Sequence, residues 1–201
     1  MRLIRSLLLL GMLSLTAGCV LSLHPIWADE DIVFEPALVG VWEDDDETWA
    51  FSQRNDSQRY DLVYTDSDGK EGKFTVTLVN VQGTLFLNLL PKEPVLEANE
   101  FYKWHLLPLN SFAHVKRIEP TLRMSFPDVD WLGDHLEAYP DAIEHELYDG
   151  TNPILTASTA ELQAFWLKHT ETEEAFTEAL DLRRKEAEHS DNEDDAPSPT
   201  P

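Results

Sequence analysis

Apolar and polar residues alternate with a period of two along most of the chain between Leu38 and Phe126. The clearest runs are residues 60–64, 74–78 and 85–89, and shorter runs lie near 101–107, 112–118 and 121–126. Such alternation places every second side chain on one face of a strand, so these runs predict half-buried β-strands. Turn-forming residues at 44–46, 66–69 and 82–83 separate the strands. The pattern predicts an antiparallel meander, either a curved sheet or a small barrel.

Helical signals follow the predicted strands, with one interruption. Asp130 is predicted to cap a short helix that carries Trp131, Leu132 and Leu136 and stops before Pro140. After that helix, residues 143–148 and 153–156 flank a turn-forming stretch and predict one more hairpin.

Two capping boxes predict two further helices. Ser158 and Glu161 form the first box, and Thr170 and Glu173 form the second. The apolar face of the first helix would hold Leu162, Phe165 and Trp166, and that of the second Phe176 and Leu180. Each helix therefore has a stripe to bury, and we expect both to pack against the strands.

The N-terminus has the three parts of an export signal. Arg2 and Arg5 give a positive start, residues 7–15 are apolar, and residues 16–18 are small. The alternative is an uncleaved membrane helix, because no residue from 6 to 23 is charged. A membrane span needs about 20 predominantly apolar residues, and this run is shorter and interrupted by polar residues. Under either interpretation, the rest of the chain is exported across the membrane.

The residues Leu15-Thr16-Ala17-Gly18-Cys19 resemble the lipobox of bacterial lipoprotein precursors. The resemblance implies that Gly18 ends the signal peptide and that Cys19 is lipidated with a diacylglyceryl thioether and an N-linked acyl chain such as palmitate. Thr16 departs from the leucine that is commonest at its position. Cys19 is the chain's single cysteine, and an exported lone thiol has no internal disulfide partner. The alternative is an unmodified buried cysteine.

Residues 22–27 and 34–42 are also similar to the mature start of a group of uncharacterised bacterial lipoproteins. That similarity implies no activity. Val20 follows Cys19 at the position where, in the enteric-bacterial pattern, an aspartate favours the inner membrane. The resemblance therefore implies a lipid-anchored protein of the cell envelope, on the outer membrane and facing the periplasm.

The charge of the chain limits its partners. It has 15 Lys and Arg against 38 Asp and Glu, a formal net charge of −23. Loss of residues 1–18 removes two arginines and leaves a net charge of −25. Such a field repels nucleic acid and anionic lipid surfaces. We expect no nucleic-acid partner, and a membrane attachment that depends on lipid.

Composition divides the chain into four regions. Residues 1–18 are the predicted signal peptide, and residues 19–36 are the lipidated N-terminus and a tether that partly docks. Residues 37–187 form one β-rich domain with C-terminal helices. Residues 188–201 are acidic and proline-rich, so they cannot bury enough apolar surface to fold and are predicted to be a disordered tail.

Two clusters resemble metal sites but lack required ligands. The stretch from His145 to Asp149 differs by one residue from the HExxH zinc motif, with Asp149 in place of the second histidine. The cluster of Asp128, Asp130, Asp134 and His135 lacks the oxygen ligand that a calcium loop of the EF-hand type needs at its fifth position. We predict no metal site.

Signals for catalysis are also absent from the sequence. There is no G-x-S-x-G nucleophile motif and no glycine-rich phosphate loop. His105, His114 and His135 could meet in space, but scattered histidines are more often surface or hydrogen-bonded core positions. The sequence predicts no catalytic, cofactor-binding or metal-binding residue, and a protein that is not an enzyme.

Gly40-Val41-Trp42 resembles the G-x-W motif of lipocalins. The resemblance implies that Trp42 plugs one end of an eight-stranded barrel whose cavity holds an apolar ligand. The alternative is that Trp42 is an ordinary core aromatic at the start of a strand.

The sequence as a whole predicts a mainly β (α+β) fold with short C-terminal helices. The barrel alternative is lipocalin-like. Two functions remain open. One is a non-catalytic, lipid-anchored interaction module that contacts another envelope protein, and the other is a lipocalin-like binder of a small apolar molecule.

Overall fold

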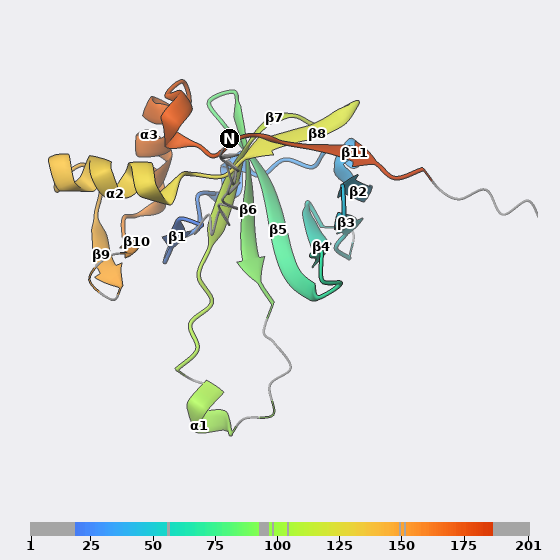
Figure 1. The fold of residues 1–201 in the computed structure, drawn as a ribbon, viewed down its shortest axis with the longest axis horizontal. Coiled ribbons are helices and arrows are strands. Elements are labelled where there is room, and N and C mark those ends of the chain that lie inside the picture. The colour runs from blue at the N-terminus through green and yellow to red at the C-terminus, as the bar shows by residue number, and fades with distance from the viewer. Residues whose placement is uncertain are drawn as a thin grey trace, which may run out of the picture.

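Eight antiparallel strands close into a barrel in the computed structural model, which describes residues 19–55, 57–92, 97, 99–103, 105–148, 150 and 152–186 (Figure 1). The barrel strands are β2 (Gly40–Asp44), β3 (Glu47–Gln53), β4 (Arg59–Thr65), β5 (Glu71–Val81), β6 (Thr84–Pro91), β7 (Ser111–Arg117), β8 (Thr121–Ser125) and β11 (Leu180–Arg184). The predicted signal peptide, Gly18 and the acidic tail 188–201 lie outside the described residues.

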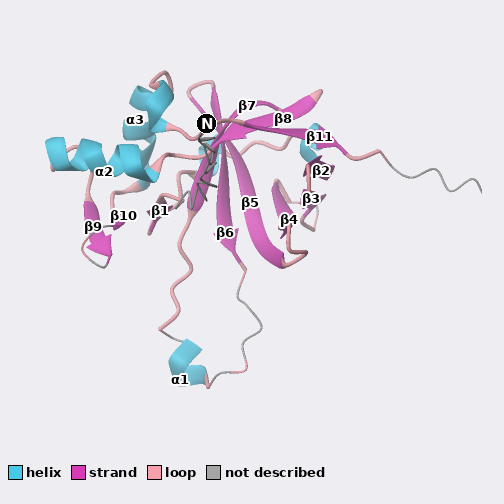
Figure 2. Ribbon diagram, viewed as in Figure 1, coloured by secondary structure: helices cyan, strands magenta, loops and turns pink. Residues whose placement is uncertain are grey.

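Seven of these strands form a meander in which each pairs with the next along the chain, and β11 then closes the ring. It pairs antiparallel with β2 on one side and with β8 on the other (Figure 2). The fold is therefore mainly β, as predicted, and the barrel is the alternative that is confirmed. The predicted turns at 44–46, 66–69 and 82–83 connect barrel strands, and the glycines Gly69 and Gly83 adopt positive φ angles there.

The inward face of the barrel is apolar because side chains alternate along each strand. Trp42 of β2 lies opposite Trp49 of β3, and Tyr60 of β4 lies opposite Val76 of β5. The buried interior residues are Leu38, Trp42, Trp49, Phe51, Tyr60, Leu62, Val76, Leu78, Leu87, Leu89, Ala113, Val115, Leu122, Met124 and Leu182. One continuous apolar core therefore runs through the barrel.

A second core lies outside the barrel, where β5, β6 and β7 are apolar on their outward faces as well. Their outward residues Val79, Val81, Phe86 and Phe112 pack under a group of elements that we call the side lobe. The side lobe consists of α2 (Val129–Ala138), α3 (Thr159–His169) and the small sheet of β1 (Leu21–Ser22), β10 (Asn152–Leu155) and β9 (His145–Tyr148). Both faces of these central strands are thus covered, which explains their long apolar runs.

Helix α3 begins at the capping box that the sequence predicts. The Ser158 hydroxyl accepts a hydrogen bond from the Glu161 amide at 3.4 Å, and the Ser158 amide donates to the Glu161 carboxylate at 2.9 Å. The predicted apolar face is buried, with Leu162 and Trp166 at 0% exposure and Phe165 at 7%. This helix belongs to the core between the side lobe and the barrel.

Helix α2 and the hairpin β9–β10 also match the prediction, but the cap of α2 is Asp128 rather than Asp130. The Asp128 side chain accepts a hydrogen bond from the Trp131 amide at 2.8 Å. An N-cap side chain bonds the amide two or three residues ahead, and Asp128 stands at that distance from Trp131. The helix ends at Ala138, before Pro140 as expected.

The predicted helix behind the second capping box is wrong. Residues 173–175 form the single 3₁₀ turn η3 (Glu173–Ala175), and the Thr172 side chain makes no capping bond there. Phe176 forms an isolated bridge with Pro127, and Leu180 begins strand β11. A spacing of four residues places side chains together on a helix face and also on a strand face, so the spacing of Phe176 and Leu180 did not distinguish the two.

The predicted strand at 101–107 is also wrong. Residues 100–103 form the one-turn helix α1 (Glu100–Lys103) within the connection from β6 to β7, and residues 105–109 are irregular. This connection projects away from the barrel (Figure 1). The next two predicted strands are confirmed as β7 and β8.

The segment 19–36 is attached to the body at several points. Val20 and Ile26 are buried, β1 pairs in parallel with β10, and Ile32 bridges Val79 on β5. The 3₁₀ turns η1 (Asp29–Asp31) and η2 (Pro36–Leu38) lead the chain into β2. The segment therefore follows the surface of the barrel before it enters the sheet.

The Trp166 side chain should contribute strongly to stability because it joins the side lobe to the barrel. Its ring contacts Phe112 of β7 with centroids 5.5 Å apart and Phe176 at 5.6 Å. We expect Trp166→Ala to lower the free energy of unfolding by about 3–5 kcal/mol, as large aromatic truncations in cores do. Chemical denaturation of the chain without residues 1–18 measures the change.

Tyr139→Ala is the matched control, because Tyr139 lies on the same lobe with 63% of its surface exposed. It should change the unfolding free energy far less than Trp166→Ala. Equal effects of the two substitutions would contradict the packing of α3 on the barrel.

Candidate functional site

One end of the barrel is sealed by Trp42 and the turn η2. The Trp42 ring is fully buried, and its Nε1 donates a hydrogen bond to the Leu38 carbonyl at 2.9 Å. Leu38 is also fully buried and belongs to the barrel core. We call this end of the barrel the sealed end. Trp42 and Leu38 therefore close this end of the eight-stranded barrel.

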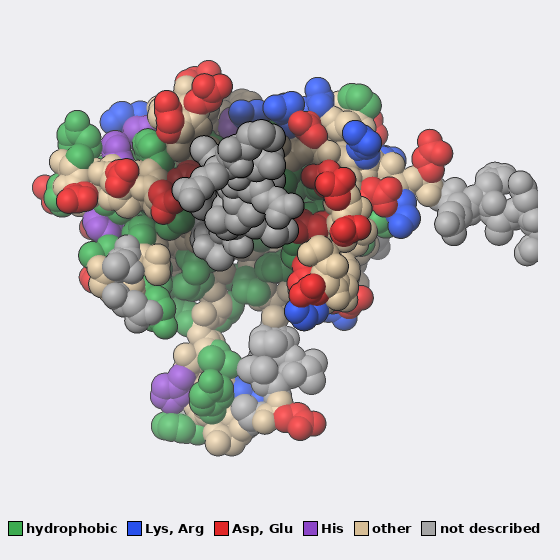
Figure 3. Space-filling model, in the orientation of Figure 1, with side chains coloured by type: hydrophobic (Ala, Val, Ile, Leu, Met, Phe, Trp, Pro, Cys, Tyr) green, Lys and Arg blue, Asp and Glu red, His purple; other side chains and the backbone are tan. Residues whose placement is uncertain are grey.

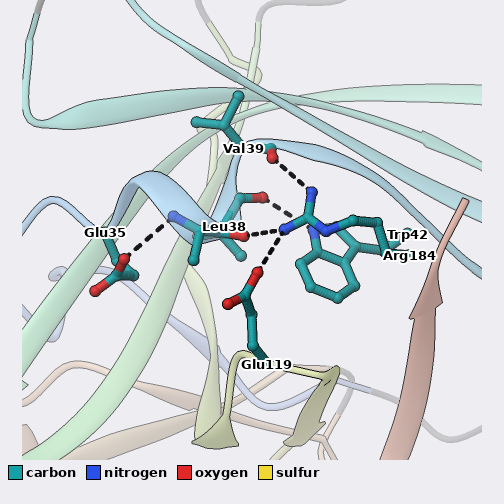
Figure 4. A network of polar contacts seen from close by, with 7 residues as sticks. Glu35, Leu38, Val39, Trp42, Glu119 and Arg184 are labelled. Carbon is teal, nitrogen blue, oxygen red and sulfur yellow. Dashed lines mark hydrogen bonds and ion pairs between the residues drawn. The ribbon is translucent and has the colours of Figure 1, made fainter. Parts of the chain in front are cut away.

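Arg184, the last residue of β11, completes the seal (Figure 4). Its guanidinium lies 4.3 Å from the Trp42 ring centroid and donates hydrogen bonds to the Val39 carbonyl at 2.9 Å and to the Ala37 carbonyl. Glu119 forms an ion pair with the same guanidinium at 3.4 Å. A charge over a tryptophan face contributes about 0.5–2 kcal/mol, depending on its desolvation. No local sequence pattern marks Arg184, because the Val39 carbonyl that it bonds lies 145 residues earlier in the chain.

Gly40 is required by this arrangement. Its φ angle is +139°, and a Cβ atom there would collide with the Arg184 guanidinium. Gly40 therefore leaves room for the Arg184 side chain, which covers the Trp42 ring.

The barrel interior is filled by its own side chains. Trp42, Tyr60, Val76, Leu122 and Met124 have 0% of their surface exposed, and Trp49 at 7% is the most exposed buried interior residue. Aromatic rings contact one another along the interior, from Phe34–Tyr60 at 5.1 Å through Phe51–Tyr60 at 6.5 Å to Trp49–Tyr64 at 4.9 Å between centroids. A core packed in this way leaves its large side chains in contact with one another.

Cys19 lies at the opposite end of the barrel, which we call the Cys19 end. Strands β4, β6 and β8 finish there, and Cys19 forms an isolated antiparallel bridge with Asp128, just beyond β8. Burial and the neighbouring Glu47 carboxylate raise the pKa of Tyr64 on the barrel rim to about 12, and the Cys19 thiol contributes to the same increase. Cys19 itself has an exposed surface, and partial burial of its thiol raises the pKa of Cys19. The residue that the lipobox resemblance marks for lipidation is therefore accessible at the rim.

A groove on the side lobe is the second candidate site, and we call it the lobe groove. The C-terminal part of α2, the chain after it and α3 form its walls. Its lining includes His135, Tyr139, Pro140, His145, Phe165 and Lys168. Beside it runs β9, the edge strand of the small sheet, on which Leu147 and Tyr148 are more than half exposed. Acidic side chains line the groove as well, namely Asp141, Glu144, Glu146 and Glu161. Mixed apolar and charged side chains and a strand edge therefore border the groove.

Two histidines meet next to the lobe groove. His135 and His169 have ring centroids 5.1 Å apart, and Trp131 stacks on His135 at 4.8 Å. Burial, and then the positive charge available to His135, lower the pKa of His169 below its usual value. The neutral imidazole is therefore favoured, and His169 Nε2 is buried without a hydrogen-bond partner among the described residues. No local sequence pattern marks this pair, although His169 follows Phe165 by one helical turn on the buried face of α3.

The other histidines do not join them. His114 packs on the outer face of β7 against Phe86 and Phe176, and His105 hydrogen-bonds through Nδ1 to the Phe101 carbonyl in the projecting connection. His145 bonds through Nδ1 to the Ile143 carbonyl. The three histidines considered together in the sequence are thus dispersed, and only His135 reaches a candidate site.

The acidic clusters serve local structure. Asp128 caps α2, and Asp66 accepts hydrogen bonds from the Asp68 and Lys70 amides within the β4–β5 turn. Asp149 lies outside the described residues. Within the described ranges, no group of three or more His, Cys, Asp or Glu side chains is arranged to hold a metal ion.

Across the part of the chain that the structure describes, no helix is both long enough and apolar enough to cross a membrane.

Comparisons with protein-family models, with curated proteins and with solved structures gave no match.

Proposed function

We propose that the protein is a lipid-anchored cell-envelope protein that acts as a non-catalytic interaction module. The observation that carries this proposal is the filled interior of the barrel, in which residues such as Trp42, Tyr60 and Leu122 are fully buried by one another. A barrel packed with its own side chains works as a scaffold, and its contacts with other molecules are made from the outside. The lobe groove and the β9 edge are the outer surface best suited to this purpose.

The lipid anchor is supported by the sequence from Leu15 to Cys19 and by the exposure of Cys19 at the barrel rim. An acceptor for lipid must be reachable by the modifying enzymes and must direct its acyl chains away from the fold. Several acyl chains give durable attachment, which the acidic body needs because its net charge of −25 without residues 1–18 opposes binding to anionic lipid. Cys19 is followed by Val20 and not by the aspartate that favours the inner membrane, so we place the anchor in the outer membrane, with the body in the periplasm.

The partner that fits the lobe groove is an extended segment of another envelope protein. The free edge of β9 offers backbone donors and acceptors to a strand, which is a recurrent way of binding peptides. Tyr139 and Tyr148 offer exposed aromatic surface at 63% and 61% of their areas, and aromatic residues are enriched at the centres of interfaces. Lys168 lines the groove together with acidic side chains, which offers charged contacts of both signs to a partner.

A second candidate function is the binding of a small apolar molecule at the rim of the barrel. One observation favours it: Trp49 Nε1 is buried and has no hydrogen-bond partner among the described residues. A buried donor without a partner is costly, and a guest with an acceptor group would satisfy it. The packed interior limits such a guest to the rim near Tyr64 and Phe126, whose rings lie 4.9 Å and 6.3 Å from that of Trp49.

Cys19→Ser should abolish incorporation of labelled fatty acid into the protein in its bacterial host, because the thioether has no acceptor. The body should then leave the membrane fraction or accumulate as the uncleaved precursor. Ser14→Ala is the control, since it changes a small residue of the same segment and keeps the thiol. Fatty-acid labelling that persists in Cys19→Ser would rule out this anchor.

A photo-crosslinking residue in place of Tyr139 should give one discrete crosslinked product in living cells, because that position borders the lobe groove. The same residue at Gln58, exposed in the β3–β4 turn, should not give this product. Adding Leu147→Asp, a charge on the exposed face of β9, should remove the product from position 139. A product that forms equally from position 58, or that is unaffected by Leu147→Asp, would contradict binding at the groove.

A further inference from the structure

The connection between β6 and β7 carries exposed hydrophobic side chains away from the barrel. Figure 1 shows α1 at the far end of this connection, and Figure 3 shows hydrophobic side chains on it. Phe101 and Leu107 are each 68% exposed, Tyr102 is 55% exposed and Leu106 is 43% exposed. We call these four residues the hydrophobic loop. Isolated exposed apolar residues are common on protein surfaces, but four of them gathered on one projection indicate a binding surface.

The shape of the hydrophobic loop is held by its own hydrogen bonds. The Tyr102 amide donates to the Asn99 side chain at 2.8 Å, and the His105 amide donates to the Tyr102 carbonyl at 3.0 Å. The His105 ring lies against that of Phe101, with centroids 4.7 Å apart, and its Nδ1 bonds the Phe101 carbonyl at 2.7 Å. The apolar side chains are thus displayed by a defined turn, which reduces the entropy lost when they bind.

Charge is mixed on the β6–β7 connection. Glu97 and Glu100 precede Phe101 and Lys103 follows it, and no acidic residue lies between Phe101 and Ile118. The apolar side chains therefore lie on the less acidic half of the connection, where repulsion from an anionic lipid surface is reduced. Aromatic residues beside leucines and a lysine are the composition of segments that lie in the membrane interface.

The base of the loop is fixed to the segment that begins at Cys19. Ser22 and Asn110 exchange backbone hydrogen bonds, each at 2.9 Å, and the Asn110 side chain bonds the Asn88 side chain at 3.0 Å. Ser22 and Asn110 are both buried. Strand β6 ends and β7 begins at the Cys19 end of the barrel, so the loop and the candidate anchor leave the same end and are joined through this buried contact.

We propose that the hydrophobic loop is a second membrane contact, which inserts its apolar side chains into the interface of the bilayer that holds the Cys19 lipid. This inference rests on the lipid anchor of the proposed function. Two attachments at one end of the barrel fix its orientation, so that the Cys19 end faces the lipid and the sealed end with Trp42 and Arg184 faces the aqueous space. A single attachment at Cys19 would leave the barrel free to rotate about that point.

The experiment places an environment-sensitive fluorophore on the loop of the full, lipidated protein. With the Cys19 thiol used by lipid, Leu107→Cys supplies the single free thiol for the dye NBD. After reconstitution into vesicles of phosphatidylethanolamine and phosphatidylglycerol, we expect the NBD emission to shift to shorter wavelength, with severalfold stronger quenching by spin-labelled lipid than at a control site. Gln58→Cys, in a turn at the sealed end, is that control.

Ser67→Cys, in the exposed β4–β5 turn, is a second control at the Cys19 end. It separates insertion of the loop from mere proximity to lipid, and its quenching should fall below that at position 107. Equal quenching at positions 107 and 58 in pure lipid vesicles would overturn the proposal. The proposal would also be overturned if the label at position 107 were shielded from water in native membranes but not in pure lipid vesicles, because the loop would then bind a protein.

Failure of the anchor gives a different result. If the unsubstituted protein reacts with NBD, Cys19 carries no lipid, and both the anchor and the loop proposal that rests on it are contradicted. If the unsubstituted protein does not react with NBD, and the label at position 107 of the variant stays in water, only the loop proposal fails.

Discussion

The pairing of β11 with both β2 and β8 is the constraint on which the rest of the structure depends, because it turns an open meander into a closed barrel. Leu182 enters the barrel core from this strand, and Arg184 covers Trp42 and bonds the carbonyls of the preceding turn. Closure removes the two edges that an open sheet would expose. It also lets inward side chains from all eight strands pack on one another, so the same strand that completes the sheet completes the core.

Closure also determines where the proposed binding surfaces lie. The chain leaves β8, builds α2, the hairpin β9–β10 and α3, and returns as β11, so both ends of this insertion are fixed by the barrel. Trp166 and Phe176 hold the insertion against β7, which keeps the lobe groove and the β9 edge on the outside. On the opposite side of the small sheet, β1 connects Cys19 to the same framework. The proposed anchor, the lobe groove and the hydrophobic loop are therefore presented by one rigid scaffold with a filled interior.

The sequence predicted an element correctly where the pattern was local and fitted only one kind of secondary structure. Alternation identified β4 to β8, and the reciprocal bonds of Ser158 and Glu161 identified the start of α3. It failed where one spacing fits two structures: Phe176 and Leu180 are four residues apart, which suits a strand face as well as a helix face. Residues 101–107 contain strand-like side chains, but no neighbouring strand pairs with them. The contacts Arg184–Trp42 and His135–His169 join distant parts of the chain, and no local pattern predicts them.

We propose that the closed barrel is a filled scaffold and that binding takes place on its outside. Native mass spectrometry of the protein purified from membranes, and then incubated with fatty acids and phospholipids, tests this most directly. A filled scaffold should give a mass equal to the polypeptide and its covalent lipid, with no further small molecule bound in a one-to-one ratio. A reproducible one-to-one complex with an apolar molecule would contradict the filled scaffold and support the binding function that the lipocalin resemblance implies.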